Sequence, residues 1–251
     1  MRIFAKNMGK QYYRYKNLAP RGSVQTSNRP ITAGSWAWFR ASNAFTDYIP
    51  ADEDAYWDRL QFFLSIPKNA TTTISNLFAL DHYLGHLQAD QYPERVRPLL
   101  KTVVRNPYDR LVSAYCFMVR GGFFNNPEYA RIAAAYLDFE DWVLRGLSAE
   151  MCARPRTFET NGWREPFLPQ CIWLTSADDK QLLIPRENIA RFENLVPDVR
   201  RVFGFEIREQ HNASVGRNRW QSYYTNPAVR KKVAEIYAED FALLGYTTEL
   251  L

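Results

Sequence analysis

An apolar run that stops at a Pro-Lys pair and is followed by three threonines constrains this chain more than any other feature. Residues 62–65 have the composition of a buried strand, and residues 66–74 supply the Pro-Lys pair, a small residue and three hydroxyls. This pattern predicts a strand, a loop and a helix N-terminus, where unpaired N–H groups and the helix dipole favour an anion. The residues expected to bind that anion are Lys68, Asn69, Ala70, Thr71, Thr72 and Thr73.

An ordinary capped helix and an ATP-binding P-loop are the alternatives to this anion-binding loop. Threonine is a common N-cap residue, so a strand followed by an ordinary capped helix would have a similar sequence. An ATP-binding P-loop would require the pattern Gly-x-x-x-x-Gly-Lys-Ser/Thr, which the segment around Lys68 lacks. The segment therefore indicates an anion-binding loop that is not of the ATP-binding type.

A second strand-to-helix junction follows in the chain. Residues 99–104 have the composition of a buried strand, and Pro107 stands where it can open a helix just after Arg105. Ser113 follows eight residues after Arg105, which places it about two turns into that helix. Each residue alone is compatible with a structural role, but together they indicate a second anion site.

In this order the two segments resemble the paired signatures of sulfotransferases that use 3'-phosphoadenosine-5'-phosphosulfate (PAPS). In that family a Pro-Lys-x-Gly/Ala-x-Thr loop holds the 5'-phosphosulfate, and an Arg with a Ser eight residues later holds the 3'-phosphate. Residues 104–115 are most similar to the carbohydrate branch, whose members include Golgi enzymes, and the resemblance covers residues 61–246. The matching residues are Lys68, Ala70, Thr71 and Thr72 in the first signature and Arg105 and Ser113 in the second.

The resemblance implies a P-loop-like sulfotransferase fold, PAPS as donor and adenosine 3',5'-bisphosphate (PAP) as product. It also implies an acceptor that bears a hydroxyl, a glycan in the carbohydrate branch, and a reaction without metal. Soluble family members close over the 3'-phosphate with an Arg-Lys-Gly loop near the C-terminus. Arg217 is the corresponding candidate here, although the order of residues differs.

The chemistry of sulfuryl transfer accounts for these residue types. Negative charge collects on the bridging oxygen as the phosphosulfate bond breaks, so a fixed cation such as Lys68 lowers the barrier more than it stabilises the ground state. The planar guanidinium of Arg105 can donate to two oxygens of a terminal phosphate.

A base must also accept the proton of the acceptor hydroxyl, and the chain holds three histidines. Soluble and heparan-type family members carry a histidine between the two nucleotide signatures, which is where His86 stands. His82 precedes it by about one helical turn, but no third ligand or His-Glu-x-x-His pattern indicates a metal site. Other carbohydrate sulfotransferases use a carboxylate, and Glu165 is the weaker candidate of that kind.

Two further classes of function stay open on the sequence alone. A nucleotide or sugar kinase using the loop at residues 67–73 for ATP would need an acidic magnesium ligand, and a non-catalytic anion-binding module would need no base. The formal charge of +5 and the pI near 9.1 suit any anionic ligand. Nucleic acid is disfavoured because the arginines are scattered and no zinc finger or RNA-binding signature occurs.

The length of 251 residues and the hydrophobic content of 46% predict a single α/β domain. We expect a mostly parallel sheet flanked by helices, with the nucleotide at the carboxyl ends of the strands. Residues 61–246 form the expected core, and residues 1–58 form an aromatic-rich arm that either covers the acceptor or packs on the core. Further helices are expected at 128–136, 139–145, 196–203 and 227–244, the last capped by Asn226, and a further strand at 181–184.

The region between residues 121 and 169 is expected to shape acceptor specificity. Arg154, Arg156 and Arg164, in the loop of this region, would suit an anionic acceptor. The three cysteines lack Cys-x-x-Cys spacing and are expected to be buried free thiols. No signal peptide or apolar run long enough for a membrane helix is visible, so we expect a cytoplasmic protein or a Golgi-type chain without its anchor.

Overall fold

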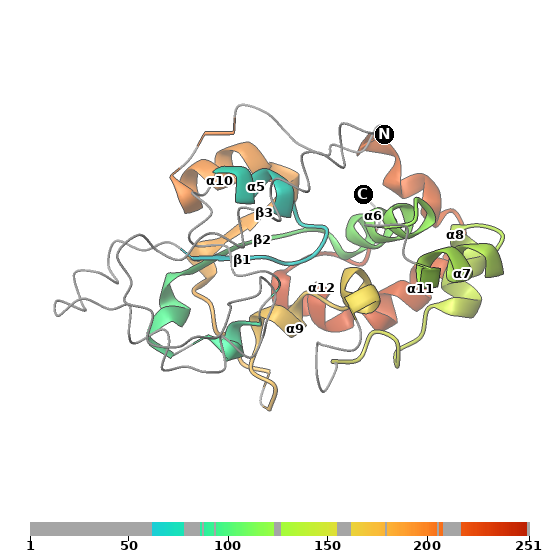
Figure 1. Ribbon diagram of the computed structural model, residues 1–251, viewed down its shortest axis with the longest axis horizontal. Helices are drawn as coiled ribbons and strands as arrows, with labels where there is room; N and C mark the ends of the chain where they lie inside the picture. The colour runs from blue at the N-terminus through green and yellow to red at the C-terminus, as the bar shows by residue number, and fades with distance from the viewer. Residues whose placement is uncertain are drawn as a thin grey trace, which may run out of the picture.

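The computed structural model describes residues 62–77, 86, 88–92, 94–122, 127–154, 162–178, 180–204, 206–207 and 217–249. These residues surround an open parallel sheet of three strands, in the order β1-β2-β3 (Figure 1). The strands are β1 (Phe62–Leu64), β2 (Leu100–Val104) and β3 (Ile189–Arg191). The expected α/β class is confirmed. The N-terminal arm, His82 and Arg156 lie outside the described residues.

The register of the sheet brings the carboxyl ends of all three strands to one edge. Phe62 lies opposite Leu100 in the first parallel pair, and Thr102 lies opposite Ile189 in the second. Both faces of the sheet are buried, which is consistent with apolar residues at most positions of the three strands.

Helices cover each face of the sheet (Figure 1). On one face, Phe63 and Val103 pack with residues of α5 (Thr71–Leu77) and α10 (Leu195–Phe203). On the other face, Leu64 and Val104 pack with residues of α9 (Cys171–Leu174) and α12 (Ala238–Leu244). The short 3-10 segments are Ala89–Gln91, Glu94–Leu99, Gly162–Phe167, Arg186–Asn188, Phe192–Asn194 and Arg217–Tyr224.

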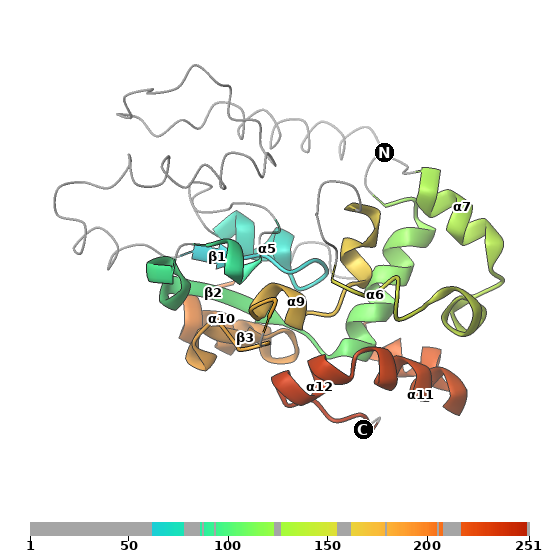
Figure 2. The same ribbon diagram turned by 90° about the horizontal axis from the view of Figure 1, so that it is seen from below.

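The expected helix after the second strand is α6 (Pro107–Val119). Asn106 caps it by accepting the N–H of Tyr108, and Pro107 occupies the first helical position, where it gives up no backbone hydrogen bond. The helix is the centre of an aromatic-rich second core beside the sheet (Figure 2). Its partners are α7 (Pro127–Ala135), α8 (Phe139–Asp141) with the π-helical turn Trp142–Gly146, α11 (Pro227–Ile236) and α12.

Two expectations about local structure were wrong. Residues 181–184 form no strand of the sheet, because Leu182 makes only an isolated antiparallel bridge with Thr175, just after α9. The C-terminal helix is not continuous either, since it breaks at Tyr237, whose buried hydroxyl donates to the carbonyl of Phe167 at 2.6 Å. Gly245 ends α12 in the left-handed conformation, as its position predicted.

Among the described residues, no helix is both long enough and apolar enough to cross a membrane.

Candidate functional site

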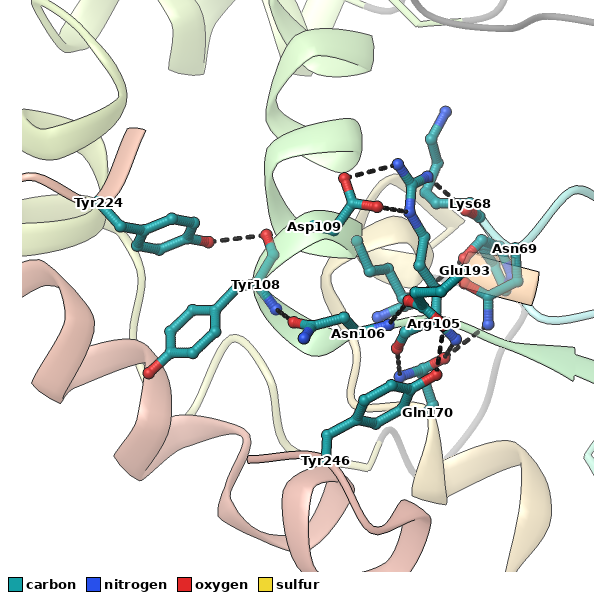
Figure 3. Close-up of polar contacts among 12 residues, drawn as sticks. Lys68, Asn69, Arg105, Asn106, Tyr108, Asp109, Gln170, Glu193, Tyr224 and Tyr246 are labelled. Carbon is teal, nitrogen blue, oxygen red and sulfur yellow. Dashed lines mark hydrogen bonds and ion pairs between the residues drawn. The ribbon is translucent and has the colours of Figure 1, made fainter. Parts of the chain in front are cut away.

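The two predicted anion-binding segments meet at the carboxyl edge of the sheet (Figure 3). Arg105 follows β2, and its Nη1 donates to the carbonyl oxygen of Lys68, in the loop after β1, at 3.1 Å. The same guanidinium lies 4.1 Å from the ring centroid of Phe192, which follows β3. All three strand ends therefore contribute to one site.

The loop between β1 and α5 has a strained backbone that other segments hold in place. Lys68 and Ala70 have φ angles of 73° and 60°, in the left-handed region that side chains disfavour. Buried Arg110 stabilises this conformation, since its Nε donates to the carbonyl of Pro67 at 3.0 Å and its Nη1 to that of Leu168 at 2.7 Å. A small side chain at position 70 suits such a turn better than a branched one.

The Lys68 ammonium lies in a partly buried, cationic environment. Its Nζ is 4.0 Å from the ring centroid of Phe117. Burial, and then the charges of Arg105 and Arg110, lower the pKa of Lys68 from 10.5 to about 8. An anion beside this nitrogen would counter the repulsion from both arginines, because opposite charges at short range favour the charged form.

Two of the predicted ligand residues support the loop with their side chains. Asn69 is buried and points inward, where its Nδ2 donates to Gln170 Oε1 at 2.6 Å and to the carbonyl of Val103 at 2.9 Å. Thr71 Oγ1 donates to the carbonyl of Ile66 at 3.1 Å. These side chains fix the loop, so a ligand would meet its backbone and Lys68, whose amine points away from this network in Figure 3.

Arg105 is held in one orientation and still has donors left for a ligand. Its Nε and Nη2 donate to the two carboxylate oxygens of Asp109 at 2.7 and 2.8 Å. With the bond to Lys68, three of its five N–H groups are used by partners in the described part of the chain, which leaves two for a ligand. Ser113 lies on α6, partly buried, and Arg217 begins a 3-10 segment, with its side chain outside the described atoms.

His86 has the tautomer that a general base requires. Its Nδ1 lies 2.9 Å from the carbonyl oxygen of Ser65, which can only accept, so Nδ1 carries the proton and Nε2 carries the lone pair. Burial, followed by the charges of Arg110 and Lys68, lowers the pKa of His86 below 6.5. The imidazole is therefore neutral at pH 7.

The protonation of Glu165, the second candidate base, is also changed by its surroundings. Burial raises the pKa of this carboxyl to about 7, so part of it is protonated at neutral pH. Within the described ranges, no group of three or more His, Cys, Asp or Glu side chains is arranged to hold a metal ion.

Two of the arginines expected to meet the acceptor are bound to the protein instead. Arg154 donates to Gln88 Oε1 and to the carbonyl of Thr175, which ties together two segments distant in the sequence. Arg164 donates from Nε to the carbonyl of Met151 at 2.7 Å. Both guanidinium groups thus bind main-chain carbonyls and have a structural role, and their contact with an acceptor stays a prediction.

All three cysteines are unpaired, as expected from their spacing. Cys152 and Cys171 are buried, and burial raises the pKa of the Cys152 thiol to about 11, so it is unreactive at neutral pH. Cys116 is partly exposed, which differs from the expectation of complete burial.

Sequence reasoning missed three buried polar residues, Arg110, Gln170 and Asp240. A signal for Arg110 was present, because it precedes buried Ala114 and Met118 at helical intervals of four residues. Gln170 and Asp240 have no such signal, since no pattern in the sequence relates one to the other.

A family model described as the sulfotransferase family matches residues 48–247 of the 251 residues. Comparisons with curated proteins and with solved structures gave no significant match. The matched range includes both loops, the whole sheet and the C-terminal helices.

Proposed function

Because the chain belongs to the sulfotransferase family, we propose that it transfers a sulfuryl group from PAPS to a hydroxyl of a carbohydrate. The family establishes sulfuryl transfer, and the identities of the donor and the acceptor are the proposal. The observation that carries it is the hydrogen bond from Arg105 to the Lys68 carbonyl, since it joins the loops predicted for the two charged ends of this nucleotide.

The donor would be held from both ends. The backbone N–H groups at the start of α5 and the ammonium of Lys68 would bind the 5'-phosphosulfate. The two N–H groups of Arg105 that have no partner among the described residues, and the hydroxyl of Ser113, would bind the 3'-phosphate, with Arg217 closing over it. Three neighbouring cations, Lys68, Arg105 and Arg110, suit a ligand with several negative charges.

In the proposed reaction the acceptor oxygen attacks sulfur in line with the bridging oxygen. His86 Nε2 takes the acceptor proton as the new S–O bond forms and the bond from sulfur to the bridging oxygen breaks. Lys68 stabilises the negative charge on that oxygen, and PAP leaves. The reaction needs no metal ion.

The acceptor class is proposed from the resemblance of residues 104–115 to the carbohydrate branch. It is tested by transfer of labelled sulfate from PAPS to a panel of glycosaminoglycans, neutral oligosaccharides and small phenols. Labelling of phenols in preference to glycans would contradict this part of the proposal.

The donor is tested by thermal unfolding with PAP, AMP and ATP at matched concentrations, because a ligand that binds only the folded state stabilises it. We expect PAP to raise the melting temperature most, and Arg105→Ala to remove most of that preference. Arg131→Ala is the matched control, since Arg131 is an exposed arginine paired with Glu128 on α7. Equal shifts with all three nucleotides would exclude PAPS, and a larger shift with ATP and magnesium would favour a kinase.

A further inference from the structure

The side-chain amide of Gln170 connects the two nucleotide loops directly (Figure 3). Gln170 is completely buried. Its Oε1 accepts the Nδ2–H of Asn69 at 2.6 Å and the backbone N–H of Arg105 at 2.9 Å. Its Nε2 donates to the carbonyl of Arg105 at 2.7 Å. One side chain thus bonds to the residue next to Lys68 and to both backbone polar groups of Arg105.

Gln170 is itself fixed from α12. The backbone N–H groups of Gln170 and Cys171 donate to Asp240 Oδ2 and Oδ1 at 2.8 and 2.7 Å. Asp240 is completely buried, and it lies close enough to Arg110 for that guanidinium to counter the effect of burial on the pKa of its carboxyl. The carboxylate therefore anchors the residue that joins the two loops.

We infer that Gln170 is a positioning residue that sets the distance between the binding sites for the two charged ends of the donor. This inference rests on the proposed function. Only an Asn or Gln side chain offers both an acceptor oxygen for two donors and an N–H donor for the Arg105 carbonyl. A ligand that binds at two points gains from its second phosphate only if both sites are held at a matching distance.

The test compares dissociation constants for PAP and AMP, which differ in the 3'-phosphate, measured by titration calorimetry at one salt concentration. Gln170→Met keeps the side-chain length and removes these three hydrogen bonds, together with a longer one from Nε2 to Asp240 Oδ2 at 3.4 Å. We expect it to lower the ratio of the AMP constant to the PAP constant at least about tenfold, while AMP binding changes by less than about threefold. A variant that only loses packing or stability would bind PAP and AMP more weakly by the same factor.

Thr175→Val is the matched control. Thr175 is a buried polar residue directly after α9, and its hydroxyl donates to the carbonyl of Cys171 and accepts from Arg154 Nη2. It should lower the melting temperature and leave the ratio unchanged. Should Gln170→Met fail to fold, Asn69→Ala removes the bond from the first loop to Gln170, together with the bond from Asn69 to the Val103 carbonyl, and should still lower the ratio by at least about threefold.

The outcomes separate this inference from the proposed function. A wild-type ratio near one would exclude the proposed donor. A large wild-type ratio that Gln170→Met and Asn69→Ala both retain, or a parallel loss of PAP and AMP binding in Gln170→Met, would overturn the positioning role alone.

Discussion

Replacing Lys68 by methionine should make the protein more stable while it abolishes most of the activity. Burial and the adjacent arginines lower the pKa of Lys68 from 10.5 to about 8, so the folded state holds this charge at a cost. Each unit of pKa corresponds to about 1.36 kcal/mol, so the cost is about 3 kcal/mol at neutral pH. Lys68→Met also loses the contact of the ammonium with the Phe117 ring, worth about 0.5–1 kcal/mol. The expected net gain is about 2 kcal/mol.

The pH dependence of this gain identifies its cause. The folded state releases the Lys68 proton near pH 8 and the unfolded chain near pH 10.5, so between these values the unfolded chain binds more protons. The contribution of Lys68 to the free energy of unfolding of the wild type therefore rises with pH across that interval. The advantage of Lys68→Met should be complete below pH 8 and should shrink toward pH 10.5.

The assay is urea unfolding at pH 7 and at pH 10, together with turnover at pH 7. Turnover should fall at least about a hundredfold, as when a preorganised charge-stabilising donor is removed. The control is Lys231→Met, because Lys231 is exposed on α11 and should change stability by less than about 0.5 kcal/mol. A variant less stable than wild type at pH 7, or a gain that is the same at both pH values, would refute the reasoning.

Three further outcomes follow from the geometry of the site. His86→Ala should bind PAP normally and lose about a hundredfold in turnover rate. The wild-type rate should rise with pH through a pKa below 6.5 and be level by pH 7. A wild-type rate that still rises above pH 7 would point to Glu165 as the base. Asp109→Asn should weaken PAP binding about tenfold and AMP binding much less, measured by calorimetry, because the bidentate contact that orients Arg105 is lost. Arg154→Met should cost about 1–3 kcal/mol in urea unfolding and leave the acceptor KM unchanged, and a raised KM would return this arginine to the acceptor site.

The meeting of the two loops could be predicted from the sequence because it needs only local patterns and one rule. An apolar run before Lys68 and another before Arg105 predicted two strands, and parallel strands present their carboxyl ends at one edge. Pro107 and Gly245 marked helix ends by backbone constraints that act within a few residues.

The third strand and the residues that join the loops could not be predicted in this way. Ile189–Arg191 is a strand of three residues beside polar neighbours, whereas residues 181–184 are more apolar and still remain outside the sheet. Short apolar segments carry no information about which strand they will pair with. Gln170 and Asp240 meet across seventy positions, and their roles depend on that contact alone.

The contacts that build the site are widely separated in the chain, and this affects how a nucleotide would change the folding rates. The bonds of Gln170 span 101 positions to Asn69, 65 to Arg105 and 70 to Asp240. Closing loops of this size costs entropy that is recovered only when the partners pack, so such contacts form late. A ligand that requires them finds little to bind in the transition state. Bound nucleotide should therefore slow unfolding in proportion to its affinity and leave the refolding rate almost unchanged.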